Sequence, residues 1–135
     1  MDLRIFTDGG ALNNPGEAAI AYVIYLGKSL FFKHGERIGI ATNNTAEYTA
    51  LIKALEKAKE VILANPVEKI LVTSDSELLV RQLNGVYKIK HSQIKEYVNR
   101  VKMLEQELQV PVSYTHTLRE GNELADSLVK KALGR

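Results

Sequence analysis

The sequence predicts an α/β fold in which a five-stranded mixed sheet is flanked by helices. Apolar runs of strand length alternate with amphipathic segments at helical spacing, and three strands precede the first helix. The order strand, strand, strand, helix, strand, two helices, strand, helix favours three antiparallel strands followed by two parallel strands. The expected strands occupy residues 3–8, 17–27, 28–38, 69–75 and 112–117.

The first three strands are expected to pair as a meander. Residues 17–27 and 28–38 are separated only by the short turn at Leu26, Gly27 and Lys28. Because a tight turn joins strands that run in opposite directions, these two strands should be antiparallel. The two later strands each follow helical segments, which is typical of parallel pairing.

Four helices are expected. Residues 45–64 carry apolar side chains at helical spacing, and residues 76–85 form a short helical piece. Residues 91–109 predict an amphipathic helix. The final helix is expected at residues 122–134, where small and branched apolar side chains recur on one face.

Composition predicts a single domain that spans residues 1–135. A chain of this length with 45% hydrophobic residues can bury a core without disulfides. The sequence has no cysteine, no long apolar run and no basic-then-apolar leader, so we expect a cytoplasmic protein without a membrane partner. No segment shows a spare apolar face, which favours a monomer.

Charge is distributed unevenly, although the net charge is only +2. Residues 81–102 carry a net charge of +5, and the rest of the chain sums to −3. A basic segment beside an acidic body is typical of a protein that contacts a polyanion. An ordinary solvated helix face gives the same pattern, so both interpretations stay open.

Four carboxylates occupy unusual positions in the predicted fold. Asp8 and Asp75 each end a predicted strand, and ligands in α/β sheets bind at the carboxyl ends of the strands. Glu47 lies one helical turn before Leu51 and shares its apolar stripe. Asp126 lies at the edge of the apolar stripe of the last helix. If the two strands are neighbours, their carboxylates share one edge of the sheet.

Each carboxylate also has a purely structural interpretation. Asp8 is compatible with an Asp-Gly turn, and Asp75 is compatible with capping the following helix. Glu47 could complete a capping box in which Asn44 is the N-cap residue. Asp126 could interact favourably with the dipole of the last helix. All four interpretations would have to hold at once, whereas one shared site accounts for the four residues together.

A shared site of four carboxylates indicates bound cations, because ionised carboxylates repel one another where water is excluded. Oxygen ligands and the absence of cysteine favour a hard ion, Mg²⁺ or Mn²⁺, over Zn²⁺. Two such ions can clamp the attacking water and the leaving oxygen in phosphodiester hydrolysis. The predicted metal ligands are therefore Asp8, Glu47, Asp75 and Asp126.

The chain resembles the type 1 ribonucleases H along essentially its whole length. Four stretches are similar to the motifs of that family, in order: TDGGALNNPG, TNNTAEYTALIKAL, ILVTSDSELLVRQL and HTLREGNELADSLVKKAL. The resemblance implies a ribonuclease H-like fold and cleavage of the RNA strand of RNA–DNA hybrids, which leaves 3′-hydroxyl and 5′-phosphate ends. It also implies that the same four carboxylates hold two metal ions when substrate is bound.

The resemblance further implies contacts to the substrate. Hybrids present a wide, shallow minor groove with 2′-hydroxyls and base edges, which amide side chains can contact as donors and acceptors. By resemblance, Asn14, Asn43 and Asn44 make these contacts. The family also places a threonine near a DNA phosphate and glycines where the backbone approaches substrate, and these are Thr42, Gly9 and Gly10. Without the resemblance, the asparagines would be interpreted as turn and cap residues.

Two departures from the family pattern concern substrate binding. Glu77 stands where many members carry glutamine, and an ionised carboxylate cannot donate a hydrogen bond and would repel phosphate. The segment before His91 is short and lacks the basic helix that many bacterial members use as a substrate handle. We expect Lys88 and Lys90 to substitute for part of that helix, with a stronger dependence of affinity on salt.

An auxiliary catalytic residue is expected near the last carboxylate, where many family members carry a mobile histidine. His116 lies ten residues before Asp126, but it falls in a predicted strand. Arg119 lies in the following stretch, and its guanidinium can stabilise phosphate charge although it cannot act as a base at neutral pH. Both are candidates, alongside a structural role for His116 and a solvated surface charge for Arg119.

Three other functions stay open from the sequence. A non-catalytic module that binds hybrids needs the amides and the basic segment but not the carboxylates. A phospho-acceptor receiver domain has a similar length and a strand-end aspartate, but it requires a helix after the first strand. A related nuclease that cleaves double-stranded RNA or DNA would use the same metal ions. Double-stranded RNA is accordingly a second candidate substrate.

Overall fold

The structure is a computed structural model that describes residues 1–86 and 88–135. Its five-stranded sheet has the order β3-β2-β1-β4-β5. The β1–β2 and β2–β3 pairs are antiparallel, and the β1–β4 and β4–β5 pairs are parallel, which confirms the predicted α/β class and strand directions. The strands are β1 (Asp2–Ala11), β2 (Gly16–Leu26), β3 (Ser29–Ala41), β4 (Lys69–Ser74) and β5 (Val112–His116).

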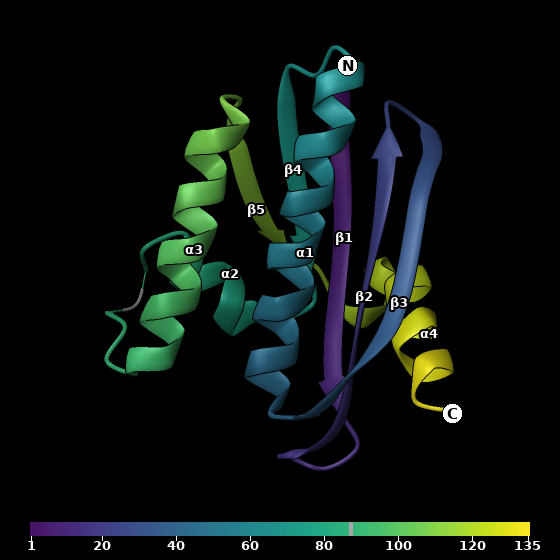
Figure 1. The fold of residues 1–135 in the computed structure, drawn as a ribbon, viewed down its shortest axis with the longest axis vertical. Helices are drawn as coiled ribbons and strands as arrows, with labels where there is room; N and C mark the ends of the chain where they lie inside the picture. The colour runs from purple at the N-terminus through teal and green to yellow at the C-terminus, as the bar shows by residue number, and fades with distance from the viewer. Residues whose placement is uncertain (87) are drawn as a thin grey trace.

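Helices cover both faces of this sheet. Helices α1, α2 and α3 lie on one face, and α4 lies on the other face over β2 and β3 (Figure 1). The final helix begins one residue later than predicted, because residues 119–122 form a 3₁₀ turn, η1, and it ends two residues earlier, at Ala132. The helices are α1 (Asn43–Ala64), α2 (Glu77–Leu83), α3 (Ser92–Leu108) and α4 (Glu123–Ala132). No helix in the described ranges combines the length and apolarity needed to span a membrane.

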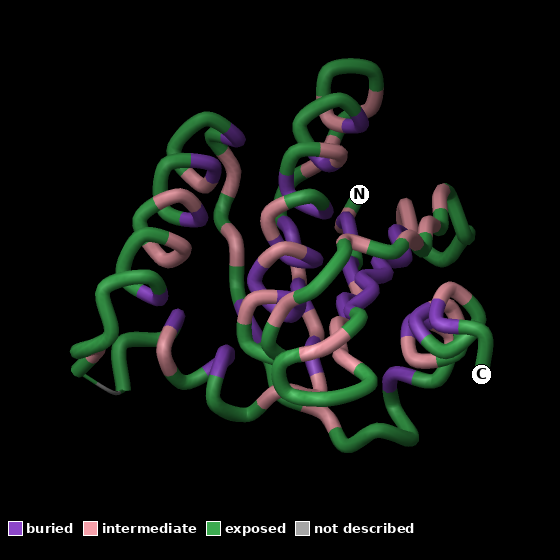
Figure 2. Tube along the Cα trace, turned by 60° about the horizontal axis from the view of Figure 1, so that its bottom comes forward, coloured by how far each residue is buried: buried purple, intermediate pink, exposed green. Residues whose placement is uncertain are grey.

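The main hydrophobic core lies between the sheet and helices α1 to α3. Alternate residues of the strands point into it, such as Leu3 and Ile5 of β1, and they meet fully buried residues of α1 such as Leu51. Figure 2 shows that the buried positions of α1 and α3 recur along one side of each helix. A smaller cluster of Ala19, Ala21, Val129 and Leu133 packs α4 against the other face.

The parallel ladders determine where the polar residues gather. Pairing between β1 and β4 ends at Thr7–Ser74, and pairing between β4 and β5 ends at Ser74–His116. Asp8 and Asp75 directly follow the last β1–β4 pair, so both carboxylates lie at the carboxyl edge of the parallel strands. Residues 84–91 connect α2 to α3, and the described part of this connection contains no additional helix.

Candidate active site

A cavity of about 510 Å³ opens at the carboxyl edge of β1 and β4. The four predicted carboxylates all line it, and they come from β1, α1, the segment after β4, and α4. One carboxylate oxygen from each of Asp8, Glu47 and Asp75 lies within 4.8 Å of the other two. Asp126 lines the same cavity outside this close group, and its Oδ2 lies 3.0 Å from Nζ of Lys130.

Gly9 allows β1 and α1 to approach closely enough for Asp8 and Glu47 to meet. A Cβ atom at Gly9 would lie 2.4 Å from the carbonyl carbon of Ala46, which immediately precedes Glu47. Only glycine can therefore occupy this position without moving the helix away from the strand. The structure shows that Gly9 makes room for α1. The approach of the Gly9 backbone to substrate, which the resemblance implies, stays a prediction.

Burial makes Asp8 and Glu47 difficult to ionise without a cation. Burial, followed by the charges of Asp75 and Asp126, raises the pKa of Asp8 to about 8. Burial, followed by the charges of Asp8 and Asp75, raises the pKa of Glu47 well above its usual range. Hydrogen bonds from the Gly9 backbone and the Ser76 side chain favour the ionised form of Glu47 but do not reverse this direction.

The donor set fits a hard divalent cation. Oε1 of Glu47 is buried and has no hydrogen-bond partner among the described residues. A buried carboxylate oxygen without a partner is costly, and a cation removes that cost. Three carboxylates that offer oxygens within 4.8 Å of one another form a suitable ligand set for Mg²⁺ or Mn²⁺.

Three of the structural alternatives for the carboxylates are wrong. Asp8 lies inside β1, where it pairs with Ala21, and not in a turn. The N-cap of α1 is Thr42 rather than Asn44, and the Thr42 hydroxyl accepts a hydrogen bond from the backbone N–H of Thr45 at 3.1 Å. The N-cap of α2 is Ser76 rather than Asp75, and its hydroxyl accepts from the N–H of Leu79 at 3.3 Å. Since neighbouring residues cap these helices, Asp75 and Asn44 remain available to the cavity.

The predicted amides lie beside the carboxylates. Asn43 and Asn44 line the main cavity, and Asn44 also lines a second hollow of about 340 Å³ together with Asn14 and Thr42. Two of the amide oxygens connect the start of α1 to β1 and to the segment after it. Oδ1 of Asn43 accepts from the N–H of Ala11 at 2.9 Å, and Oδ1 of Asn14 accepts from the N–H of Asn43 at 3.0 Å.

His116 and Arg119 both line the cavity and are both exposed. His116 is the last residue of β5 and pairs with Ser74, as its strand pattern indicated. Arg119 is the first residue of η1. Gly10 also lines the cavity, and a Cβ atom there would meet only the Val129 side chain, at 3.9 Å.

The basic segment is only partly available to a polyanion. Arg81 pairs with Glu77 at 2.5 Å, Arg100 with Glu56 at 3.2 Å and Lys102 with Glu105 at 3.3 Å, so three of its six cations have acidic partners. Lys88 and Lys90 are exposed and have no ion pair within the described residues. They are not among the described residues that line either hollow.

Three residues near the carboxylates were not singled out from the sequence: Ser76, Asn122 and Lys130. Ser76 lines the cavity and hydrogen-bonds Glu47, and its position as N-cap after a strand-end acid could have suggested it. Lys130 follows Asp126 by four residues, the spacing of a helical ion pair. Asn122 is buried, which no local pattern indicates.

Comparison with known proteins identifies the family of this chain. A family model described as "Reverse transcriptase-like" matches residues 6–132. Ribonuclease HI of Halobacterium salinarum is 36% identical over 97% of this chain. The crystal structure of LC11-RNase H1 in complex with RNA/DNA hybrid covers 98% of this chain and 96% of that one, with a TM-score of 0.92 and 39% identity. The chain belongs to the type 1 ribonuclease H family.

The family relationship extends over the whole fold. The crystal structure of RNase H1 from the same halophilic archaeon covers 99% of this chain and 98% of that one, with a TM-score of 0.90 and 34% identity. The chain spans 64% of the length of the curated Halobacterium ribonuclease HI and 36% of the mycobacterial relative named "Bifunctional protein Rv2228c", to which it is 30% identical. A solved structure described as the N-terminal RNase H domain of rv2228c covers 98% of this chain at 31% identity, so a similar domain occurs within a longer protein.

Proposed function

We propose that residues 1–135 form a single catalytic domain that cleaves the RNA strand of RNA–DNA hybrids and leaves 3′-hydroxyl and 5′-phosphate ends. The observation that carries the proposal is the group formed by Asp8, Glu47 and Asp75, which converges in a cavity that also contains Asp126. The solved complex of LC11-RNase H1 with a hybrid supports the substrate class, since that protein shares the fold and 39% identity.

The proposed reaction needs divalent ions, Mg²⁺ or Mn²⁺, with two per site when substrate is bound. Asp8, Glu47, Asp75 and Asp126 would hold them. Such ions supply positive charge that activates water and stabilises the leaving oxygen. The carboxylates contribute fixed ligands from four separate elements, so the positions of the ions depend on how closely β1, α1, β4 and α4 pack.

The amides are proposed to bind the minor groove of the hybrid. Since the Asn14 and Asn43 amide oxygens accept backbone hydrogen bonds, their Nδ2 groups are oriented to donate to 2′-hydroxyls and base edges. Thr42 and the exposed Lys88 and Lys90 are proposed phosphate contacts. The same groups would tolerate double-stranded RNA, which also has an A-form minor groove.

A cleavage assay with matched duplexes tests this function. We expect the labelled RNA strand to be cut in a hybrid with Mg²⁺ or Mn²⁺ and to remain intact with EDTA. Cleavage of RNA–RNA at a comparable rate would favour the broader nuclease. Binding without cleavage under all metal conditions would favour a non-catalytic hybrid-binding module. We further propose that the protein is a cytoplasmic monomer. Sedimentation of the purified chain tests the oligomeric state.

Replacing Asn44 by alanine should weaken hybrid binding without loss of stability. Thr42 caps α1, so Asn44 makes no capping bond that the substitution removes. We expect KM for the hybrid to rise more than kcat falls, because groove contacts already form in the ground state. Asn43→Ala is the matched comparison, since it also removes the bond to Ala11 and should lower the melting temperature. An unchanged KM in folded Asn44→Ala would contradict groove binding by this residue.

Replacing Arg119 by alanine should lower kcat by about 10-fold or more with little change in KM, because an exposed guanidinium at the cavity edge can stabilise phosphate charge. His116→Ala should cost less, since His116 is held at the end of β5. Steady-state kinetics of both variants from about pH 6 to 9 decide between them. A larger loss for His116→Ala, with disappearance of the acidic limb of the pH profile, would reverse the assignment.

A further inference from the structure

Asn122 is a buried amide at the beginning of α4 with an incomplete set of hydrogen bonds. Its side chain is 2% exposed. Its Nδ2 donates to the carbonyl oxygen of Thr7 at 2.8 Å, and its Oδ1 has no hydrogen-bond partner among the described residues. Leaving a buried polar atom unpaired costs about 1–3 kcal/mol. The unpaired Oδ1 therefore offsets the stability that the Nδ2 hydrogen bond provides, so stabilisation of the fold alone does not explain this amide.

The Asn122 hydrogen bond joins the backbone beside one carboxylate to the helix that carries another. Thr7 immediately precedes Asp8, and Asn122 precedes Asp126 by four residues, about one helical turn. Thr7 also belongs to the last residue pair of the β1–β4 ladder. The bond thus fixes the start of α4 at the point where the paired strands end and the cavity begins.

The other contacts of α4 are the apolar packing of its buried residues, which include Ala125 in the first turn, and a hydrogen bond at its far end. Apolar residues of its later turns pack on β2, and Nε of Arg37 donates to the carbonyl oxygen of Ala132 at 2.7 Å. Within the described ranges, the bond from Asn122 to Thr7 is the hydrogen bond that connects η1 or α4 to β1. Apolar packing of Ala125 also holds the first turn of α4, but this side chain supplies the directional contact between that turn and the residue before Asp8.

Electrostatic repulsion acts against that position. Asp8 and Asp126 face the same cavity, and like charges favour their separation. Lys130 pairs with Asp126 at 3.0 Å, but both residues belong to α4, so this ion pair does not hold the helix to β1. A tie between the two elements is needed to keep the carboxylates at a fixed separation.

We propose that Asn122 is a positioning residue that, by holding the start of α4 to Thr7, sets the separation of Asp8 and Asp126 for binding of the second divalent ion. The proposal rests on the metal site of the proposed function. Groups that orient metal ligands typically change metal affinity by 10–100-fold when they are removed. The loss of the Asn122 amide should have an effect of that size on the ion held by Asp126.

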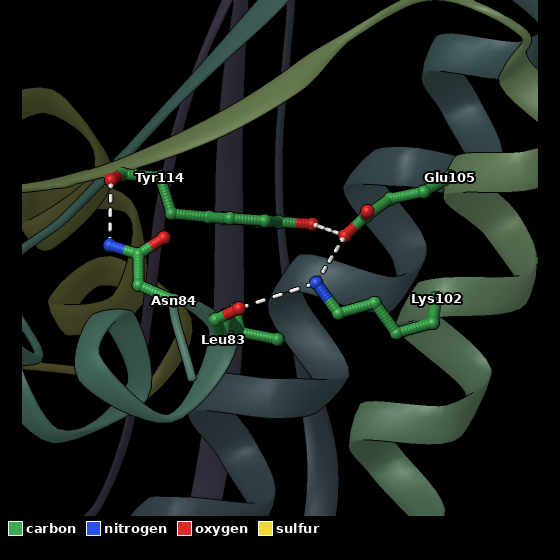
Figure 3. Close-up of polar contacts among 5 residues, drawn as sticks. All are labelled: Leu83, Asn84, Lys102, Glu105 and Tyr114. Carbon is green, nitrogen blue, oxygen red and sulfur yellow. Dashed lines mark hydrogen bonds and ion pairs between the residues drawn. The ribbon is translucent and has the colours of Figure 1, made fainter. Parts of the chain in front are cut away.

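The test uses Asn122→Leu, which keeps the branched shape of the side chain but cannot donate a hydrogen bond. Asn122→Ala serves as a second variant. The matched control is Asn84→Ala, which removes another bond from an asparagine Nδ2 to a backbone carbonyl, that of Tyr114, at 3.3 Å. Figure 3 shows this bond beside the contacts of Tyr114, Glu105 and Lys102, and Asn84 does not line the cavity.

The measurement is the melting temperature in EDTA and over a titration with Mn²⁺, because ions that bind only the folded state raise it. For wild type and Asn84→Ala we expect the same Mn²⁺ dependence. For both Asn122 variants we expect the part of the rise that depends on Asp126, measured as the difference from Asp126→Asn, to require about 10-fold more Mn²⁺. In cleavage assays, kcat should fall at fixed Mg²⁺ with little change in KM.

A double-variant cycle separates positioning from a general loss of stability. If Asn122 acts through Asp126, Asn122→Leu has no further effect on the Mn²⁺ dependence in an Asp126→Asn background. The proposal would be overturned if the effects of the two substitutions were additive, or if the melting temperature of the Asn122 variants depended on Mn²⁺ as in the wild type. Failure of both Asn122 variants to fold would also overturn it. A wild-type melting temperature that does not change with Mn²⁺ would contradict the metal site as well. Mn²⁺ dependence without any cleavage would contradict the proposed function alone.

Discussion

The Asp8→Asn variant should lose RNA cleavage by more than about 1000-fold in kcat while retaining hybrid binding, because the change removes a ligand charge and preserves the side-chain shape. Glu47→Gln should behave in the same way, since its carboxylate belongs to the same close group. Asp2→Asn is the matched control, because Asp2 begins β1 at the end opposite the cavity. Cleavage by Asp8→Asn at near wild-type rate with saturating Mg²⁺ would contradict the metal assignment.

The same variant should be more stable than wild type in EDTA, with a defined pH dependence. The folded protein raises the pKa of Asp8 from 3.8 to about 8, so the folded state binds more protons than the unfolded state between these values. Stability of the wild type therefore falls as pH rises through this window. The stability difference between Asp8→Asn and wild type should grow from about pH 4 to pH 8 and then level off. Thermal unfolding across this range measures it.

The Gly9→Ala variant should lose about 3 kcal/mol or more of unfolding free energy. The new Cβ would lie 2.4 to 2.7 Å from backbone atoms of Ala46 and Glu47, which cannot rotate away as a side chain could. Relief of this overlap requires α1 to move from β1, so cleavage should fall as well, because Glu47 moves with α1.

Gly10→Ala is the control for this prediction. Its Cβ would contact only Val129, at 3.9 Å, which is an ordinary separation. We expect a change of less than about 1 kcal/mol. Urea unfolding of the two variants measures the difference, and equal destabilisation would contradict the assignment of Gly9 to strand–helix packing.

Much of the fold could be predicted because its signals are periodic or local. The strand-length runs, the tight turn at Gly27 and the helical stripe of α1 each follow from neighbouring residues, and the strand-end positions of Asp8 and Asp75 place two carboxylates at one edge. Asp126 lines the same cavity from a helix on the other face of the sheet. The sequence indicated this only indirectly, through the position of Asp126 at the edge of an apolar stripe and through the resemblance.

The remaining features depend on contacts between distant residues. Both Thr42 and Asn44 are good cap residues, and only the backbone path decides that Thr42 caps α1. The need for glycine at position 9 arises from a helix that begins more than thirty residues later. Likewise, Arg100 forms an ion pair with Glu56 of another helix. The net charge of residues 81–102 therefore overstates the positive charge that is available to bind a polyanion.

The nature of the product ends tests the central claim most directly. A hybrid with a labelled RNA strand is incubated with the wild-type chain and Mg²⁺, and the termini of the fragments are identified. Metal-assisted attack by water predicts 3′-hydroxyl and 5′-phosphate ends, no products in EDTA, and none with Asp8→Asn. Fragments ending in 2′,3′-cyclic phosphate, or cleavage that persists in EDTA, would contradict the assignment of hydrolysis to this carboxylate site.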